Sequence, residues 1–280
     1  MTATLRHPRI APSPVGRLLQ HWRQVRQKSQ LAVALDAEIS ARHLSFVESG
    51  RARPSQDMVL RLAGALDVPL REQNDLLLAA GYAPIFRETD LDAPEMTWAR
   101  TALELILEHQ EPYPAVVMDR NWNILTTNSA ATRLFGRFVD LDALPSPVNV
   151  IRLMFDPAGL KPWVENWEPV AEALIQRIYR EAVGGVPDEA TAALLAEILA
   201  YPDTPRRWRS PHPTVRPAPL LPVQFRIGDL RLSFFSTITT LGTPQDITLQ
   251  EIRIECFFPA DEETQAAFPP LASSRERWAD

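Results

Sequence analysis

The chain has 280 residues, of which 45% are hydrophobic, so it has room for two globular domains of ordinary size. No apolar run is long enough to span a membrane, the N-terminus lacks the apolar core of a signal peptide, and Cys256 is the only cysteine. These features exclude disulfide-rich secreted and membrane classes and indicate a cytoplasmic protein.

Charge is distributed unevenly along the chain. Residues 1–83 contain 11 Lys and Arg against 7 Asp and Glu, a net charge of +4, whereas the remainder carries −10. A basic N-terminal region joined to an acidic remainder is typical of a DNA-reading module attached to another domain.

The N-terminal region predicts short helices around one core. The first runs from about Pro14 to Lys28, with Leu19 and Trp22 on its apolar face. Residues 29–55 then predict two short helices joined by a tight turn, the arrangement of a helix-turn-helix motif. Their N-caps are Ser29 and Ser40, and Gly50 is suited to the left-handed position that ends a helix. Two more helices, over about 55–66 and 69–81, complete five.

This stretch resembles the xenobiotic-response-element (Cro/CI-like) family of bacterial helix-turn-helix regulators. The matching residues are Gln30, Val33, Ala34, Ile39, Ser40, Leu44, Val47, Glu48, Gly50, Pro54 and Ser55. The resemblance implies that Arg23 pairs with Glu48. One departure is Glu38, which stands where the family usually has glycine and would cost roughly 1 kcal/mol in a left-handed turn.

The resemblance also implies which residues meet double-stranded DNA, bound by a homodimer. By family position, the second helix of the motif reads bases through Ala41, Arg42 and Phe46, with Ser45 beside them. The Arg42 fork matches guanine O6 and N7, and Phe46 is suited to a thymine methyl group. Phosphates are expected to meet Gln30, Ser40 and Arg51. The alternative is a helical hairpin that only fills a core, but it leaves Phe46 on a basic helix surface unexplained.

The rest of the chain predicts a linker and an α+β domain. Residues 84–94 form an acidic, proline-bearing linker, and a helix follows over about 95–110 with Trp98, Leu103, Ile106 and Leu107 on its apolar side. Further elements are a hairpin at 114–119 and 122–127, helices at 128–135, 148–155, 165–182 and 188–199, and a basic, proline-rich crossing at 205–222.

The last third alternates apolar and polar residues, over 223–227, 230–238 and 252–258. Period two with one polar face indicates antiparallel strands with helices on the other side. Five strands, with helices inserted between the second and the third, resemble a PAS-like domain. We therefore expect an all-α helix-turn-helix domain (1–83), a linker (84–94), a PAS-like domain (95–262) and a tail (263–280).

The second domain is also similar to the MmyB-like ligand-binding domain that follows the same helix-turn-helix in actinobacterial and related regulators. The shared residues are Pro114, Ala115, Trp122, Asn123, Asn128, Leu134, Asn149, Arg152, Phe155, Asp156, Trp167 to Val170, and Trp208. The resemblance implies a small-molecule pocket, for which a fatty-acid-like ligand is expected.

We expect an elongated apolar cavity for a long-chain acyl ligand in this domain. Its predicted wall residues all lie on apolar faces: Val117, Ile124, Leu134, Phe155, Trp163, Leu174, Phe225, Leu232 and Phe234. Asn128, Asn149 and Arg152 are predicted to receive the carboxylate. The alternative is that the apolar residues fill a solid core, while both asparagines cap helices and Arg152 is solvated.

The sequence contains no pattern typical of catalysis, of a metal site or of a cofactor site. The five histidines have no ligand spacing, and Cys256 reads as a buried thiol within a strand. We therefore predict a transcription regulator rather than an enzyme. Two alternatives stay open: an enzyme that acts on the pocket ligand, and a constitutive DNA-binding protein whose second domain only dimerises.

Overall fold

The computed structural model describes residues 13–184, 189–201, 204–205, 208 and 220–268. The chain forms two compact units. The first contains the described residues up to Glu88 together with the segment Pro244–Gln250, and the second contains most of the remainder. None of the helices among the described residues has the length and apolar character needed to cross a membrane.

The first unit holds the five short helices that the sequence predicts. They are α1 (Pro14–Val25), α2 (Gln30–Asp36), α3 (Ala41–Glu48), α4 (Gln56–Ala65) and α5 (Leu70–Ala80). The hydroxyls of Ser29, Ser40 and Ser55 each accept a hydrogen bond from a backbone N–H three residues on, at 3.1 to 3.3 Å. These caps satisfy N–H groups that have no partner inside the helix, so the helix starts follow from the serine positions.

Left-handed residues end these helices. Gly50 has φ 76° and terminates α3, and Glu38 has φ 54° in the turn between α2 and α3. The helix-turn-helix therefore keeps its left-handed turn residue without glycine. α1 ends at Val25, three residues earlier than predicted, because Gln27 takes φ 52° and leaves the helical region.

The second unit is built on a five-stranded antiparallel sheet, as predicted. Its strands are β1 (Ala115–Met118), β2 (Ile124–Thr127), β3 (Val223–Ile227), β4 (Leu230–Thr239) and β5 (Arg253–Pro259), in the order β2-β1-β5-β4-β3. The register places Val116 opposite Glu255 and Val117 opposite Ile254. The molecule is thus an all-α helix-turn-helix domain followed by a PAS-like α+β domain.

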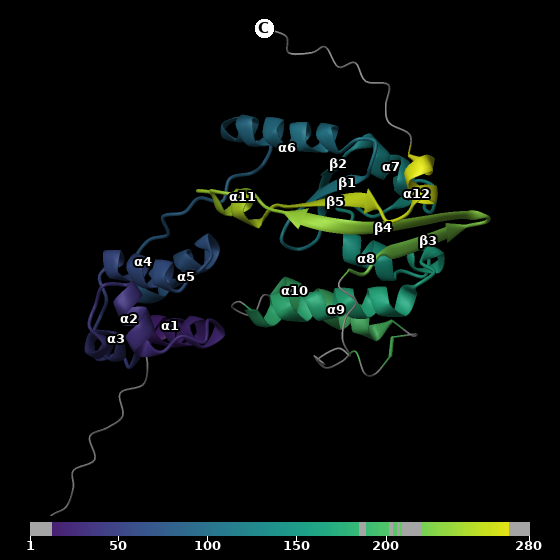
Figure 1. Cartoon of the computed structure of the whole chain (residues 1–280). Coiled ribbons are helices and arrows are strands. Elements are labelled where there is room, and N and C mark those ends of the chain that lie inside the picture. Colours follow the sequence, from purple (N-terminus) through teal and green to yellow (C-terminus); the bar gives the residue numbers. More distant parts are fainter. Residues whose placement is uncertain (1–12, 185–188, 202–203, 206–207, 209–219, 269–280) are drawn as a thin grey trace, which may run out of the picture. The chain divides into compact units, whose positions relative to one another are not determined.

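Helices cover both faces of this sheet (Figure 1). On one face lies α6 (Thr97–Gln110), and on the other lie α8 (Val150–Phe155), α9 (Trp167–Gly184) and α10 (Glu189–Ala200). The remaining short elements are α7 (Ser129–Phe135), α11 (Ile247–Glu251), α12 (Glu262–Ala267) and the 3-10 turns Pro94–Met96, Leu141–Ala143 and Lys161–Trp163.

The core of the second unit fills the space between the sheet and helices α7 to α10. Val116 and Met118 pack into it, with Phe155, Trp208 and Phe225 among its larger members. Because side chains alternate along a strand, Val117 points to the opposite face, toward α6. The second unit therefore has apolar packing on both faces of β1.

The predicted burial of Trp98 is wrong: this side chain is 86% exposed. Leu103 and Leu107 are the buried residues of α6. Five and nine residues separate Trp98 from them, which at about 100° per residue places it on the opposite side of the helix.

The predicted start of the tail is also wrong. Residues 262–267 form α12, whose N-cap Asp261 accepts a hydrogen bond from Thr264 N at 2.8 Å. The Thr264 hydroxyl accepts one from Ser233 N on β4, and Phe268 is buried in the core. The last helix is thus anchored to the sheet. Asp188, most of the basic crossing and residues 269–280 lie outside the described part of the chain.

The predicted limits of the first domain change in two places. Ile85 N and Phe86 N donate to the Asn74 side chain, which ties the start of the predicted linker to α5. The segment Pro244–Gln250, assigned by sequence to the second domain, belongs to the first unit. There Gln250 Oε1 accepts a hydrogen bond from Leu70 N at 2.7 Å, at the start of α5.

Candidate functional site

Helix α3, the second helix of the helix-turn-helix, is held by a buried carboxylate. Glu48 is 1% exposed and accepts hydrogen bonds from Arg23 Nε at 2.7 Å, Arg23 Nη2 at 3.1 Å and Gln30 Nε2 at 2.7 Å. The pair predicted between α1 and α3 is therefore present. The hydrogen bonds from Arg23 to Glu48 raise the pKa of Arg23 above its usual value against the effect of burial, and the charge of Glu48 adds to the rise. Residues from α1 and α2 thus fix one end of α3.

On the opposite side of α3, one arginine of the helix and one that follows it lie around an aromatic ring. Leu44 and Val47 are buried in the core, which leaves Arg42 exposed on the outer side of the helix. The Phe46 ring is half-buried and has the guanidinium carbons of Arg42 and Arg51 at 5.3 Å and 5.6 Å from its centre. Cations at this distance are attracted to the face of an aromatic ring, so the two arginines and the ring form one cluster.

The remaining predicted DNA contacts lie around this cluster. Ala41 and Ser45 are half-buried on α3, and Ser40 is exposed at its N-terminus. Gln30 stands at the start of α2, but its side-chain amide nitrogen is used inside the domain by Glu48. A phosphate would therefore meet the backbone at this helix start rather than this nitrogen.

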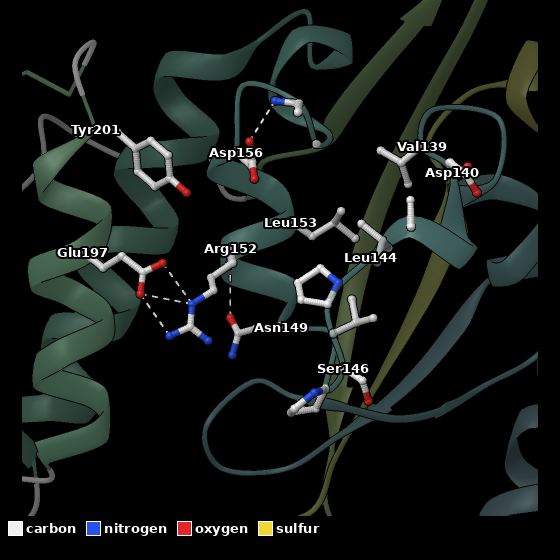
Figure 2. A pocket seen from close by; sticks show the side chains of 16 residues that line it. Val139, Asp140, Leu144, Ser146, Asn149, Arg152, Leu153, Asp156, Glu197 and Tyr201 are labelled. Carbon is white, nitrogen blue, oxygen red and sulfur yellow. Dashed lines mark hydrogen bonds and ion pairs between the residues drawn. The ribbon is translucent and has the colours of Figure 1, made fainter.

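The second unit contains a cleft of about 580 Å³ beside α8 and α10 (Figure 2). This volume falls in the usual range for small-molecule sites. One wall is the loop between α7 and α8, which contributes mostly apolar residues: Val139, Ala143, Leu144, Pro145, Pro147 and Val148. Leu153 and Gly159 add to this wall from α8 and the turn after it.

The other wall is polar and charged. Arg152 lies between Asn149, whose Oδ1 accepts a hydrogen bond from the Arg152 backbone N–H, and Glu197 of α10 (Figure 2). Glu197 accepts from Arg152 Nε at 3.0 and 3.1 Å and from Nη2 at 2.9 Å, and these bonds raise the pKa of Arg152. Tyr201 and Asp156 complete this wall. Burial, and then the charges of Asp156 and Glu197, raise the pKa of Tyr201.

Of the predicted ligand residues, Asn149 and Arg152 line this cleft. The apolar residues predicted as its wall lie elsewhere. The structure places Ile124, Leu134, Phe155, Trp163, Leu174, Phe225, Leu232 and Phe234 in or against the core cluster, and Val117 on the other face of the sheet. Side chains from α8 and α9 cover the face of the sheet that bears the core cluster, and aromatic pairs fill the space where the cavity was predicted. Phe138 and Phe225, for example, have their ring centres 5.1 Å apart.

Asn128 has a structural role. Its Oδ1 accepts hydrogen bonds from Ala131 N at 2.9 Å and from Ala115 N at 3.0 Å, which caps α7 and fixes the start of β1. Its Nδ2 donates to the Tyr113 carbonyl at 2.8 Å. The side chain is buried and these bonds occupy it, so it has little capacity left for a ligand carboxylate.

Sequence reasoning missed Glu197, Tyr201, Asp156 as a lining residue, and the loop over 139–148. Glu197 lies 45 residues from Arg152 on another helix, and no local pattern links the two. One feature of the sequence could have indicated the loop. The stretch around Leu144 contains two prolines, which are unfavourable inside a helix and in a central strand.

Comparison with known proteins identifies two families along the chain. A model of the MmyB-like transcription regulator ligand binding domain matches residues 99–271, and a helix-turn-helix model matches residues 19–73. A comparison of the sequence with curated proteins found no match. One similar solved structure, of an RNA-binding light-oxygen-voltage receptor, is 12% identical with a TM-score of 0.30. The alignment covers 91% of this chain but only 61% of that receptor.

The two family matches agree with the two compact units except at Pro244–Gln250, which lies within the ligand-binding match but belongs to the first unit. The helix-turn-helix match contains α2 and α3, and the ligand-binding match contains the whole sheet and the cleft. The second match alone spans more than half of the chain. The chain therefore belongs to the MmyB-like transcription regulators, as a DNA-binding protein with a ligand-binding domain.

Proposed function

We propose that this regulator binds operator DNA as a homodimer through α3, and that a small amphiphilic molecule in the cleft changes its affinity for DNA. A protein with this function acts on bacterial DNA in the cytoplasm. The observation that carries the proposal is the cluster of Arg42, Phe46 and Arg51 on the outer side of a helix whose inner side is locked by Glu48.

The positions of the two arginines support a base contact by Arg42 and a phosphate contact by Arg51. Arg42 lies near the start of α3, where the second helix of a helix-turn-helix meets base edges. Arg51 follows the helix, where a cation meets the DNA backbone. Phe46 between them offers an apolar surface for a thymine methyl group.

The cleft supports a ligand with an apolar chain. Its loop wall is formed largely by aliphatic and proline side chains, and a fatty-acid-like molecule is one class that has such a chain. Each methylene removed from water contributes about 0.8 kcal/mol, so affinity is expected to rise with chain length until the wall is covered.

DNA selection from a randomised duplex library tests the proposal. The wild-type chain is expected to select two half-sites about one helical turn apart, as a dimer of this motif requires. Arg42→Ala is expected to lose about 1–3 kcal/mol of preference at one base position, while Arg51→Ala weakens specific and random DNA alike. Equal losses on both DNAs for both variants would contradict the assignment of α3.

A further inference from the structure

We propose that the cleft takes a primary amine carried on an apolar chain, an alkylammonium-type amphiphile, rather than a carboxylate. This inference rests on the proposed function, in which the cleft is the ligand site, and deepens it by naming the head group. It concerns the wall formed by α8, α10 and the residues that follow them.

Charge in the cleft favours a cation. Among the described residues that line it, Asp140, Asp156 and Glu197 carry negative charge and Arg152 carries positive charge, a net of −2 at pH 7. Burial is the main cause that raises the pKa of Tyr201, and the charges of Asp156 and Glu197 raise it further against the charge of Arg152. A ligand carboxylate would enter against this field.

The one guanidinium among these lining residues is already engaged. Glu197 takes Nε and Nη2 of Arg152 in a two-pronged pair, the geometry that a ligand carboxylate would need. A fatty acid that took this two-pronged contact would have to displace Glu197 and leave its charge uncompensated, and one that met only the remaining Arg152 N–H groups would lie beside the Glu197 carboxylate. An ammonium group leaves this pair in place and adds a positive charge beside Asp156 and Glu197.

A buried acceptor next to the cleft independently points to a hydrogen-bond donor. A hollow of about 160 Å³ shares Asn149 and Arg152 with the cleft, and Asn121 also lines it. The Asn121 Oδ1 atom is buried and has no hydrogen-bond partner among the described residues. Buried acceptors without a donor are uncommon in folded proteins. An amine head group that extends from the cleft into this hollow would supply donors for this oxygen, whereas a carboxylate would supply none.

Titration calorimetry with three ligands of one chain length tests the inference. Octylamine, 1-octanol and octanoate carry the same chain with a positive, neutral and negative head group at pH 7. The full-length protein at low salt is expected to bind octylamine more tightly than octanoate by about tenfold or more, with octanol between them. Added salt should reduce the difference in affinity between octylamine and octanoate, because the side chains of Arg152 and Glu197 are about half exposed and salt screens exposed charges.

Variants of the charged wall make the test specific to this cleft. Asp156→Asn combined with Glu197→Gln removes two negative charges and leaves the Arg152 guanidinium unpaired, so the preference is expected to reverse toward octanoate. Asp142→Asn is the matched control: this exposed acid is close in sequence but is not among the lining residues. It should leave the order of the three ligands unchanged. Circular dichroism confirms that each variant is folded.

The outcomes separate the two proposals. If octanoate binds more tightly than octylamine to the wild-type protein and the double variant does not change that order, the head-group inference is wrong while the ligand site stands. If none of the three ligands binds and none alters DNA affinity, the cleft is not the ligand site and both proposals fail. Tighter binding of octylamine that the double variant reverses supports the amine.

Discussion

Glu48 shows how one buried charge fixes the position of the second helix of the helix-turn-helix. Its side chain is 2% exposed, and Arg23 and Gln30 supply donors to both of its oxygens. A carboxylate in this position is tolerated only while it is paired, because an isolated buried charge is costly. The side-chain pair therefore sets the orientation of α3 relative to α1.

Arg23→Ala is expected to lower the free energy of unfolding by about 3 kcal/mol, because it leaves Glu48 buried without its cation. Denaturant unfolding followed by circular dichroism measures the change. Arg61→Ala is the control, since Arg61 pairs with Asp57 on the surface of α4 and such a pair is worth about 0.5 kcal/mol. Similar small losses for both variants would mean that the Arg23 pair is open in solution.

Glu255 is a second carboxylate whose surroundings set its behaviour. Burial raises its pKa above the ordinary value near 4.5, against the hydrogen bond from Ser236 and the charge of Arg177. The Ser236 hydroxyl donates to Glu255 Oε1 at 2.6 Å from the neighbouring strand β4. This carboxyl binds its proton more strongly in the folded state than in the unfolded state.

Folding stability should therefore depend on the proton at Glu255. Its contribution is fully present below the unfolded pKa and is lost as pH rises through the folded pKa. Glu255→Gln removes this loss. The free energy of unfolding of the variant minus that of the wild type should therefore be larger at pH 7 than at pH 4. Urea unfolding at a series of pH values measures the difference. Glu104→Gln, an exposed change on α6, is the control, and identical pH profiles for both variants would contradict the prediction.

At the scale of elements, α1 and α3 approach each other through a glycine. A Cβ atom at Gly16 would lie 2.4 Å from the carbonyl oxygen of Glu48 and 2.8 Å from that of Val47. These atoms belong to backbone, which cannot rotate away as a side chain can. The close contact therefore depends on the absence of a side chain at Gly16.

Gly16→Ala is expected to destabilise the first unit by about 1–3 kcal/mol and to weaken DNA binding, because α3 must move to make room. Gly64→Ala on α4 is a matched control, since nothing lies within 4 Å of its added methyl group. At this helical position alanine should stabilise by about 0.5–1 kcal/mol. Melting temperatures and DNA affinities of the two variants check the prediction, and a neutral Gly16→Ala would contradict it.

At the scale of the whole molecule, charge and connectivity divide the chain in different ways. Basic residues outnumber acidic ones in the first 83 positions, and acidic residues outnumber basic ones in the remainder. The segment Pro244–Gln250 nevertheless belongs to the first unit, where Ile247 N donates to the Arg87 carbonyl. Composition therefore identifies the DNA-binding module, but the chain returns to it a second time between β4 and β5.

Local chemistry determined much of this fold from sequence alone. Ser29, Ser40 and Ser55 start helices because their hydroxyls satisfy the nearest free N–H groups, and such caps depend only on neighbouring residues. The strands over 223–227 and 253–259 follow from period-two alternation, because successive side chains of a strand point to opposite faces of the sheet. The pairing of Arg23 with Glu48 came from the family resemblance and is present.

Only the tertiary structure decided where the cleft that we propose as the ligand site lies. The apolar residues predicted as a cavity wall look the same in sequence whether they enclose a space or fill it, and here helices α8 and α9 fill it. The cleft instead lies where Arg152, Glu197 and Tyr201 meet, on segments distant in the chain. Its charge is a sum over residues that only folding brings together, so no local pattern could reveal it.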